Sequence, residues 1–429
     1  MTDTRTYAIM AKPVGSRCNL RCDYCYYLDK PAGALMDDEL LEEYTKQVIA
    51  VHGRDAEIEF AWHGGEPTLA GTAFFEKAAA FQKIYGKGRV IRNSLQTNAT
   101  LLDDELCRFF REHGFLLGVS VDGPEELHNR YRGNTFTRVM EGIELLRKHG
   151  VPFNTLTAVH AGNCSEPERV YAFLSELTDH MQFLPVVEFL PTACDTKLRS
   201  NGCEPETQMP NNTASSYSNF RPLISYEKER GLRFSPPPGV YSRSQRSGRA
   251  AEFSLKPDDF GKFLCGILNV WKREDAKFVQ LFETTLGAIL GQKGGVCSHE
   301  AICGHCACVL ENGDVYCCDR YCHGNYRLGN IRTEPLGTLL EKNREFGMYK
   351  TYSLTDKCYD CEYVRLCFGG CPKDRVFTGA GGADGGGENH NYLCESYRRF
   401  FATFSLRRKR LPGFRQRGGR NMAQPRDVE

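Results

Sequence analysis

The stretch CNLRCDYCYY, residues 18–27, sets Cys18, Cys22 and Cys25 in a C-x3-C-x2-C spacing directly after a β-like run. A 4Fe-4S cube normally takes one thiolate per iron, so three thiolates in one short loop would leave one iron open to a small molecule. The alternative is a zinc knuckle or a set of incidental buried thiols, because a short motif is only a hypothesis until its context supports it. The stretch therefore predicts an iron-sulfur cluster with an open corner.

The composition of the chain restricts where such a cluster would work. A chain of 429 residues can hold two domains, and its net charge of +1 gives no bulk attraction to nucleic acid or to an anionic membrane. No run approaches the ~18 apolar residues of a membrane helix, and the N-terminus lacks the apolar core of a signal peptide, so we expect a cytoplasmic protein. In that reducing compartment the 20 cysteines favour metal ligation over disulfides, with low oxygen if the metal is iron.

Outward from the cysteine stretch, residues 7–189 alternate short β-branched or aromatic runs with longer amphipathic ones. Helix-like runs such as residues 37–53 and 138–150 separate six strand-like runs: TYAIMAKPV (6–14), EIEFAW (57–62), RVIRNSLQTN (89–98), GFLLGVSVDG (114–123), VPFNTLTAV (151–159) and MQFLPVVEF (181–189). Six strand-helix units indicate a parallel α/β architecture with both faces of the sheet covered. The pattern alone fits a doubly wound sheet as well as a barrel.

Polar and glycine-rich segments follow the strand-like runs, where α/β barrels place their functional loops. WHGGEPTL (62–69) follows the second run, LQTNAT (95–100) the third and SVDGP (120–124) the fourth. In the first of these segments, the glycines allow close backbone approach to a ligand, and Glu66 offers a charge-assisted hydrogen-bond acceptor. Taken alone, residues 64–67 (the GGEP segment) are as consistent with an ordinary turn as with a ligand-binding loop.

The cysteine spacing, the aromatic residue before Cys25 and the later GGEP segment together resemble the radical S-adenosylmethionine (SAM) enzymes. The resemblance implies a partial (β/α)6 barrel with an open side for a long substrate, and an open iron that chelates the amino and carboxylate groups of SAM. It also implies residues that contact SAM. Gly64, Gly65 and Glu66 match the residues that hold the SAM ammonium. Tyr24 matches the residue near the adenine, Ser120 the one that binds the ribose, and Arg132 the one that binds the carboxylate. A capping serine and a solvated surface arginine are the plainer alternatives for Ser120 and Arg132, and Asp122 lies beside the same site.

The C-terminal half carries a second cysteine pattern, in VCSHEAIC, GDVYCCDRY, CYDCEYVRLCFGGC and YLC. It resembles the SPASM extension of radical SAM enzymes, specifically that of the anaerobic sulfatase-maturating enzymes. The resemblance implies two auxiliary 4Fe-4S clusters, hence three clusters in all, the first held by Cys297, Cys303, Cys318 and Cys371 and the second by Cys358, Cys361, Cys367 and Cys394. Four thiolates leave no open iron, which suits electron transfer or a structural role. Two zinc sites of four thiolates each are the alternative.

Asp319 follows the cysteine that the resemblance assigns to the first auxiliary cluster. In the sulfatase-maturating enzymes an aspartate at this position takes the side-chain proton of the substrate, and we expect a nearby anionic cluster to raise the proton affinity of this one. A loop aspartate that bonds its own backbone is the alternative. The adjacent Cys317 makes the choice of Cys318 uncertain by one position, and we assign no role to Cys306, Cys308, Cys317 or Cys322.

The sequence divides into four expected parts. Residues 1–192 would form the radical SAM barrel and residues 253–400 the SPASM domain. Between them, residues 193–252 are rich in Ser, Asn, Pro and Gly without periodicity and read as an irregular insertion or linker. The basic residues 401–429 read as a disordered tail.

Taken together, the resemblance covers nearly the whole chain apart from the insertion and the tail. It implies a radical SAM oxidoreductase that uses SAM and three 4Fe-4S clusters to oxidise a cysteine or serine of a sulfatase polypeptide to Cα-formylglycine. The partners would be the sulfatase and an electron donor such as flavodoxin or ferredoxin, with no nucleic acid and no membrane. A SPASM peptide maturase that forms a thioether or carbon-carbon crosslink is the nearer alternative, and a non-enzymatic metal-binding scaffold the more distant one.

Overall fold

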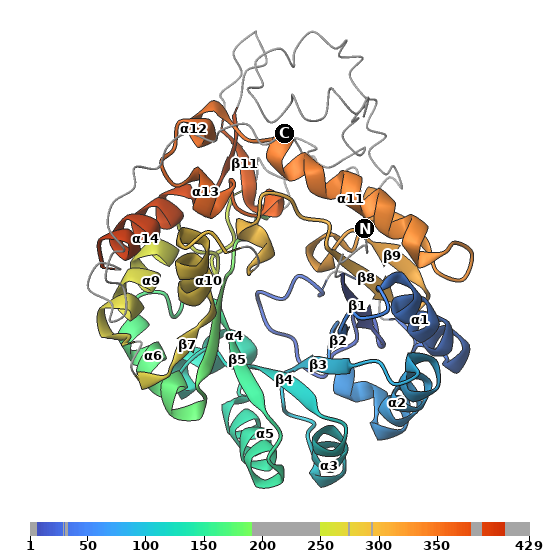
Figure 1. Ribbon diagram of the computed structural model, residues 1–429. Coiled ribbons are helices and arrows are strands. Elements are labelled where there is room, and N and C mark those ends of the chain that lie inside the picture. Colours follow the sequence, from blue (N-terminus) through green and yellow to red (C-terminus); the bar gives the residue numbers. More distant parts are fainter. Residues whose placement is uncertain are drawn as a thin grey trace, which may run out of the picture.

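The computed structural model describes residues 7–28, 30, 33–190, 249–272, 275–292, 295–378 and 388–407. One curved sheet, in the strand order β10-β9-β8-β1-β2-β3-β4-β5-β6-β7, organises the fold (Figure 1). All neighbours from β8 to β7 are parallel, whereas β9 and β10 are antiparallel additions. No pairing between β10 and β7 closes the sheet among the described residues, so the barrel is open.

Strands β1 to β6 and the helices between them form the predicted strand-helix units. The strands are β1 (Ala8–Lys12), β2 (Ile58–Trp62), β3 (Ile91–Thr97), β4 (Phe115–Ser120), β5 (Phe153–Val159) and β6 (His180–Pro185). The helices are α1 (Asp38–Val51), α2 (Thr72–Gly86), α3 (Asp104–Glu112), α4 (Glu125–Arg132), α5 (Phe136–His149) and α6 (Pro167–Leu177). Figure 1 shows α1, α2, α3, α5 and α6 on the outside of the curve, which confirms the partial barrel and excludes the doubly wound sheet.

Local sequence explains where the barrel helices begin and which face they bury. The Asp37 side chain caps α1 by accepting a hydrogen bond from the Leu40 amide at 2.8 Å, and Asp103 caps α3 in the same way through Leu106 at 2.8 Å. On α1 the residues at helical spacing, among them Leu41, Tyr44 and Val48, are buried against the sheet. The core beneath the helices is aromatic and includes Trp62, Phe75, Phe110 and Phe115.

The region expected as a separate C-terminal domain also extends the barrel sheet at both edges. Strand β7 (Phe278–Val279) pairs in parallel with β6, and β8 (Cys306–Leu310) pairs in parallel with β1 from Ala8↔Cys306 to Lys12↔Leu310. Strands β9 (Asp314–Tyr316) and β10 (Arg327–Asn330) continue from β8. The expected division at residue 253 therefore does not separate two sheets. The pairing of β8 with β1 brings the second cysteine region beside the first.

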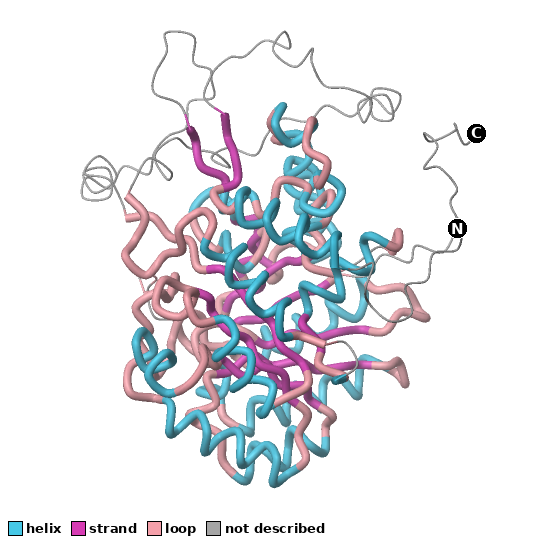
Figure 2. The backbone as a smooth tube through the Cα atoms, turned by 90° about the vertical axis from the view of Figure 1, so that its left-hand side faces the viewer, coloured by secondary structure: helices cyan, strands magenta, loops and turns pink. Residues whose placement is uncertain are grey.

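The remaining labelled helices lie along the left side and the top of Figure 1. The helices are α9 (Asp259–Val270), α10 (Gln280–Ile289), α11 (Leu336–Tyr352), α12 (Asp356–Tyr359), α13 (Val364–Cys367) and α14 (Cys394–Arg407), with short 3-10 helices at Pro67–Ala70, Cys297–His299, Asp319–Tyr321, Gly324–Tyr326 and Pro372–Asp374. Strands β11 (Arg375–Thr378) and β12 (Glu388–Asn391) form a separate hairpin (Figure 2).

Two of the expected boundaries change in the structure. Helix α14 continues to Arg407, because Phe400, Phe401 and Phe404 are buried in the core, so the tail expected from residue 401 cannot begin before residue 408. Residues 191–248 of the expected insertion, with Cys194 and Cys203, and residues 408–429 lie outside the described part of the chain.

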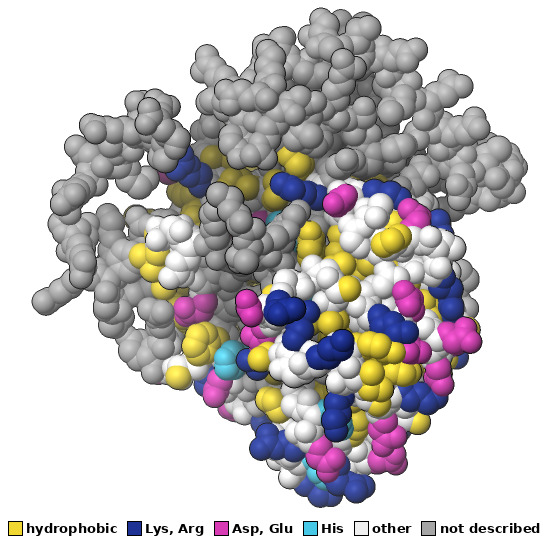
Figure 3. Space-filling view, turned by 45° about the vertical axis from the view of Figure 1, so that its right-hand side comes forward, with side chains coloured by type: hydrophobic (Ala, Val, Ile, Leu, Met, Phe, Trp, Pro, Cys, Tyr) yellow, Lys and Arg dark blue, Asp and Glu magenta, His cyan; other side chains and the backbone are white. Residues whose placement is uncertain are grey.

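The described surface carries both signs of charge. On the face drawn in Figure 3, basic and acidic side chains are interspersed, in keeping with the net charge of +1. In the part of the chain that the structure describes, no helix combines the length and the apolar character that crossing a membrane requires.

Candidate functional site

The loop after β1 carries Cys18, Cys22 and Cys25 and is fastened to the GGEP segment by backbone hydrogen bonds. The amide of Gly65 donates to the Gly15 carbonyl at 2.9 Å, and the amide of Glu66 donates to the Arg17 carbonyl at 2.8 Å. A Cβ atom at Gly65 would lie 1.9 Å from the Arg17 carbonyl oxygen, so this close approach requires glycine. The two predicted motifs therefore form one structural unit at the ends of β1 and β2.

The three thiols of this loop would have to lose their protons to bind a metal cluster. Burial raises the pKa of Cys22 to about 11, with Arg132 opposing the shift, and burial also raises the pKa of Cys18 and Cys25. Unbound thiols would therefore stay protonated, and binding of a metal would displace their protons. Among the described residues no three His, Cys, Asp or Glu side chains converge on a point that would hold a single ion. A cube does not require such convergence, because each thiolate binds a different iron.

Glu66 lies deep in the protein at the end of β2. It is 1% exposed, and its carboxylate accepts hydrogen bonds from the amide and hydroxyl of Thr68, the hydroxyl of Thr97 and the amide of Asn98, at 2.7 to 3.2 Å. Burial raises the pKa of Glu66, although these hydrogen bonds oppose the shift. The carboxylate thus ties the ends of β2 and β3 together, and a contact with the SAM ammonium remains a prediction.

The expected SAM contacts Tyr24 and Arg132 meet on the carboxylate of Asp122. The Tyr24 hydroxyl donates to Asp122 Oδ2 at 2.5 Å, and Arg132 Nε donates to the same oxygen at 2.8 Å. His160, which follows β5, places its Nε2 atom 3.6 Å from Asp122 Oδ2. Burial raises the pKa of Asp122, but Arg132 and His160 lower it by more, so it lies below its usual range. Ser120 ends the neighbouring strand β4 and is also buried.

Asp319 lies at the centre of a second polar cluster, which joins it to the cysteine loop. Its carboxylate accepts hydrogen bonds from Lys12 Nζ, from the Tyr26 hydroxyl and, at 2.6 Å, from the Tyr27 hydroxyl. His63 Nδ1 lies 3.8 Å from Asp319 Oδ1. Lys12 also lies over the Tyr27 ring, 4.1 Å from its centroid. Asp319 therefore bonds to groups far away in the sequence and is not a loop aspartate that bonds its own backbone.

The electrostatics of Asp319 differ from the sequence expectation. Burial raises its pKa, but the charge of Lys12, the proximity of His63 and the hydrogen bonds from Lys12 and Tyr26 lower it below the usual range. The expected rise in proton affinity concerned a nearby anionic cluster and stays a prediction. Among the protein groups, the buried cation Lys12 holds Asp319 in its ionised form.

Electrostatic proximity joins several members of each of the two sets of four that the sequence pattern implies, and Cys306 also lies within range of Cys297 and Cys303. In the first set, Cys371 raises the pKa of Cys297, Cys303 and Cys318 by its proximity, in addition to the larger effect of burial. In the second set the thiols of Cys358, Cys361 and Cys367 act on Cys394, whose pKa burial raises to about 12. That these sets bind clusters stays a prediction.

The adjacent cysteines 317 and 318 have different surroundings. Cys317 is buried in an apolar cluster with Tyr321, Tyr326 and Phe346, and its thiol donates to the Tyr326 carbonyl at 3.3 Å. Cys303 is within electrostatic range of both thiols, whereas Cys371 acts on Cys318. This placement favours Cys318 as the member of the first set.

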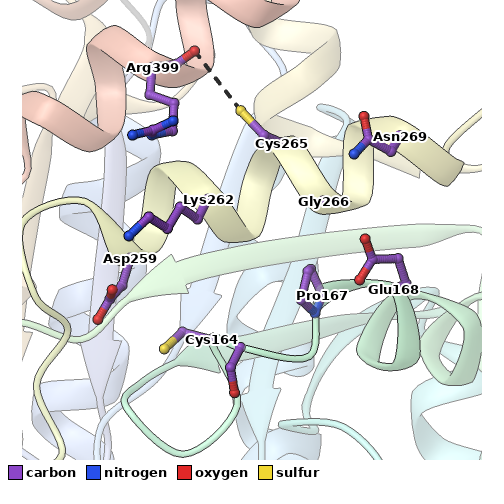
Figure 4. Close-up of a pocket in the computed structure, with 10 residues that line it drawn as sticks. Cys164, Pro167, Glu168, Asp259, Lys262, Cys265, Gly266, Asn269 and Arg399 are labelled. Atoms are coloured by element: carbon purple, nitrogen blue, oxygen red, sulfur yellow. Dashed lines mark hydrogen bonds between the residues drawn. The ribbon is translucent and has the colours of Figure 1, made fainter.

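The cavity drawn in Figure 4 lies away from all of these residues. It has a volume of about 480 Å³ and lies between the start of α6 and helices α9 and α14, and its lining includes Cys164, Lys262 and Cys265. The Cys265 thiol there donates to the Arg399 carbonyl at 3.9 Å. None of the predicted site residues lines this cavity, so its volume does not identify the place where the chemistry occurs.

The sequence analysis missed five residues of these clusters. Lys12 is the last residue of β1, His63 follows β2, and His160 follows β5. The same rule that drew attention to the loops after the strands would have identified them. Tyr26 and Tyr27 lie within the quoted cysteine stretch, where only the cysteines and Tyr24 were singled out.

Comparison with known proteins agrees with this geometry. A profile of the Radical SAM superfamily matches residues 13–174. The serine-type anaerobic sulfatase-maturating enzyme of Bacteroides thetaiotaomicron is 37% identical over 409 residues, which cover 92% of this chain and 88% of that protein. The cysteine-type enzyme of Clostridium perfringens is 31% identical over 412 residues, which cover 92% of this chain and 95% of that protein. The solved structure of anSMEcpe with bound AdoMet and the Cp18Cys peptide matches with a TM-score of 0.73 at 29% identity, over 93% of this chain and 97% of that one.

Proposed function

This chain belongs to the anaerobic sulfatase-maturating enzymes of the radical SAM superfamily, and on that premise we propose how its residues carry out the reaction. It oxidises a cysteine or a serine of a sulfatase polypeptide to Cα-formylglycine. Both substrate types occur among the similar proteins, and similar solved structures hold AdoMet together with a peptide. AdoMet and a 4Fe-4S cluster are therefore its cofactors.

We infer that the three sets of thiols hold three clusters. Cys18, Cys22 and Cys25 would bind the cluster with the open iron, and the two C-terminal sets of four would bind the auxiliary clusters. When bound, the open cluster and SAM supply the 5′-deoxyadenosyl radical that removes a Cβ hydrogen, and the auxiliary clusters accept the electron that the substrate then releases. A flavodoxin or ferredoxin would deliver the first electron.

The Asp122 cluster would orient SAM beside the open iron. Nε of Arg132 donates a hydrogen bond to the Asp122 carboxylate, and the other guanidinium nitrogens would bind the SAM carboxylate. Asp122 also fixes the Tyr24 hydroxyl, so the ring of Tyr24 can lie against the adenine. Ser120 at the end of β4 would bond the ribose.

The Asp319 cluster would act on the side chain of the substrate. Lys12 keeps the carboxylate ionised, and Tyr26 and Tyr27 fix its direction, so Asp319 would be the unprotonated group that accepts the thiol or hydroxyl proton. One observation carries the proposal: Asp319, beside the C-terminal thiols, bonds to Tyr26 and Tyr27, which directly follow Cys25. This contact supports the proposal, because the proposed base would then lie next to the cysteine loop where the radical would form.

A product analysis tests the reaction. The protein is incubated without oxygen with SAM, a reductant and a CxPxR peptide or its serine counterpart, and the products are treated with a hydrazine probe before mass spectrometry. Formylglycine carries an aldehyde that the probe captures, whereas a thioether or carbon-carbon crosslink does not react. SAM cleavage with a product that resists the probe would favour the crosslinking alternative, and no SAM cleavage would favour the metal-binding scaffold.

A further inference from the structure

Helix α11 carries no cysteine, yet one of its faces holds the first C-terminal cysteine segment, residues 297–306. Asn343, Gly347, Lys350 and Thr351 occupy positions i, i+4, i+7 and i+8, which share a face of the helix. Asn343 Nδ2 donates to the carbonyls of residues 304 and 306, at 3.2 and 2.8 Å, and the Thr351 hydroxyl donates to the carbonyl of residue 301. The helix thus binds the backbone of this segment at several points.

Gly347 sets the distance between helix and segment. A Cβ atom at this position would lie 1.9 Å from the Cys303 carbonyl oxygen, and the Cys303 amide donates to the Gly347 carbonyl at 3.2 Å. Cys303 is therefore held directly against the helix. The contact is made by protein groups alone, and so it needs no metal.

Lys350 is the charged member of this face and is 1% exposed. Its ammonium donates to the carbonyls of Cys297, at 3.1 Å, Ser298, at 2.9 Å, and Glu300. Three carbonyl acceptors match the three hydrogens of an ammonium group, and no carboxylate among the described residues forms an ion pair with it. Burial lowers the pKa of Lys350, whereas hydrogen bonds from the ammonium to the carbonyls stabilise its charged form and the nearby thiols of Cys303, Cys371 and Cys297 oppose the shift.

The groups around this cation include thiols of the first set. The charge of Lys350 lowers the pKa of Cys297 and Cys303 against the larger effect of burial. Cys371, the member of the set that is most distant in the sequence from Cys297, also interacts with the Lys350 charge. A second buried cation, Arg375, donates to the Lys350 carbonyl at 3.0 Å and to the Gly369 carbonyl at 3.2 Å, and so links α11 to the turn before Cys371.

We propose that Lys350 is a positioning residue that holds the Cys297 turn and places a positive charge beside the first auxiliary cluster, which raises the reduction potential of that cluster. The proposal rests on the proposed function, because it requires the cluster to be present. Cluster potentials depend on net charge, on hydrogen bonding and on exposure to solvent. A nearby buried cation favours the reduced, more negative cluster, which would help it to accept the electron from the substrate.

The test compares Lys350→Gln with wild type in the full-length chain in which Cys18, Cys22 and Cys25 are all alanine, so that only the C-terminal clusters contribute. Glutamine keeps two N–H donors for the carbonyls but loses the charge. In an anaerobic redox titration followed by electron paramagnetic resonance, we expect one midpoint to shift to more negative potential. The matched control is Lys342→Gln, which removes the same charge from an exposed position on the same helix, where Lys342 pairs with Glu334, and should leave both midpoints unchanged.

The outcomes separate this inference from the proposed function. An iron content of about eight per chain in the alanine background supports two cubes, and about four or fewer would overturn the two-cluster part of the function and this inference with it. With the iron in place, an unshifted midpoint in Lys350→Gln overturns the inference alone. If Lys350→Gln loses iron, Lys350→Arg decides: retained iron and a wild-type midpoint support the role of the charge, and loss of iron in both variants contradicts it.

Discussion

Lys12 and Asp319, separated by 307 positions in the sequence, form an ion pair in which the lysine side chain is fully buried and the aspartate side chain is 20% exposed. The pair exists because β8 adds to the barrel beside β1, so that the turn after β9 reaches the end of β1. Through this pair the barrel and the C-terminal cysteine region build one site.

Breaking the pair from the lysine side should destabilise the protein. Lys12→Met leaves a largely buried carboxylate without its cation, a change that costs roughly 3–5 kcal/mol in buried pairs. We expect the lower end of this range, because Asp319 keeps some contact with water. Denaturant unfolding under anaerobic conditions measures the loss, and the double variant Lys12→Met/Asp319→Asn should recover part of it. No recovery in the double variant would show that the two residues do not depend on each other.

Removal of the three N-terminal thiols should separate the clusters. In the Cys18, Cys22 and Cys25 triple alanine variant, iron should fall from roughly twelve to about eight atoms per chain, if each cube holds four irons. SAM cleavage should be lost, while visible absorption from the C-terminal clusters remains. Iron and zinc analysis measures the metal content, and assays of SAM cleavage and visible absorption measure the other two changes. SAM cleavage at the wild-type rate, or two zinc ions per chain in place of iron, would reject the assignment of the cysteines.

Arg132 should contribute to SAM binding through the guanidinium nitrogens that Asp122 leaves open. A hydrogen bond to a charged group contributes about 1.5–3 kcal/mol, so Arg132→Met should weaken SAM binding by roughly 10- to 100-fold. Calorimetry on the reconstituted protein measures this affinity. Arg130→Met, on the exposed face of the same helix, is the control and should bind SAM as the wild type does. Equal affinities in the two variants would remove Arg132 from the SAM site.

Gly65→Ala should damage the cysteine loop without touching a cysteine. The added Cβ would meet the Arg17 carbonyl oxygen at 1.9 Å, so the loop must move. We expect about one third of the iron to be lost, from the N-terminal site alone, together with SAM cleavage. The control is Gly337→Ala, whose Cβ would make an ordinary contact of 3.8 Å with Val51. Full iron in Gly65→Ala would mean that the close approach is not needed.

Much of the fold followed from the sequence, because barrel strands and their helices are local patterns. The predicted run at residues 6–14 contains β1, and the GGEP segment lies where the strand order required it. Strand β8, in contrast, was not predicted, and only its cysteines were noted. Its pairing with β1 depends on a contact between segments that are distant in the sequence. The sixth run was predicted to extend to residue 189, but β6 ends at Pro185, and Phe189 instead bridges to Ala250.

The same distinction applies to the site. Motif residues such as Cys18 and Glu66 could be recognised by their spacing. The charge around Asp319 could not, because Lys12 approaches it only in the folded chain, so the lowering of the Asp319 pKa by this cation was not expected. Lys350 is a similar case, since nothing near it in the sequence shows that its ammonium meets the turn at Cys297.

The central claim is that Asp319 accepts the side-chain proton of the substrate. Asp319→Asn keeps the size of the side chain but removes the base, and its matched control is Asp314→Asn in the same hairpin, where Asp314 pairs with Arg327. The deciding measurement is the ratio of formylglycine to 5′-deoxyadenosine formed in one anaerobic incubation with SAM, reductant and peptide. We predict that Asp319→Asn still forms 5′-deoxyadenosine while the ratio falls by roughly 10²-fold, the scale of general-base loss, and that Asp314→Asn keeps the wild-type ratio. A wild-type ratio in Asp319→Asn would contradict the claim.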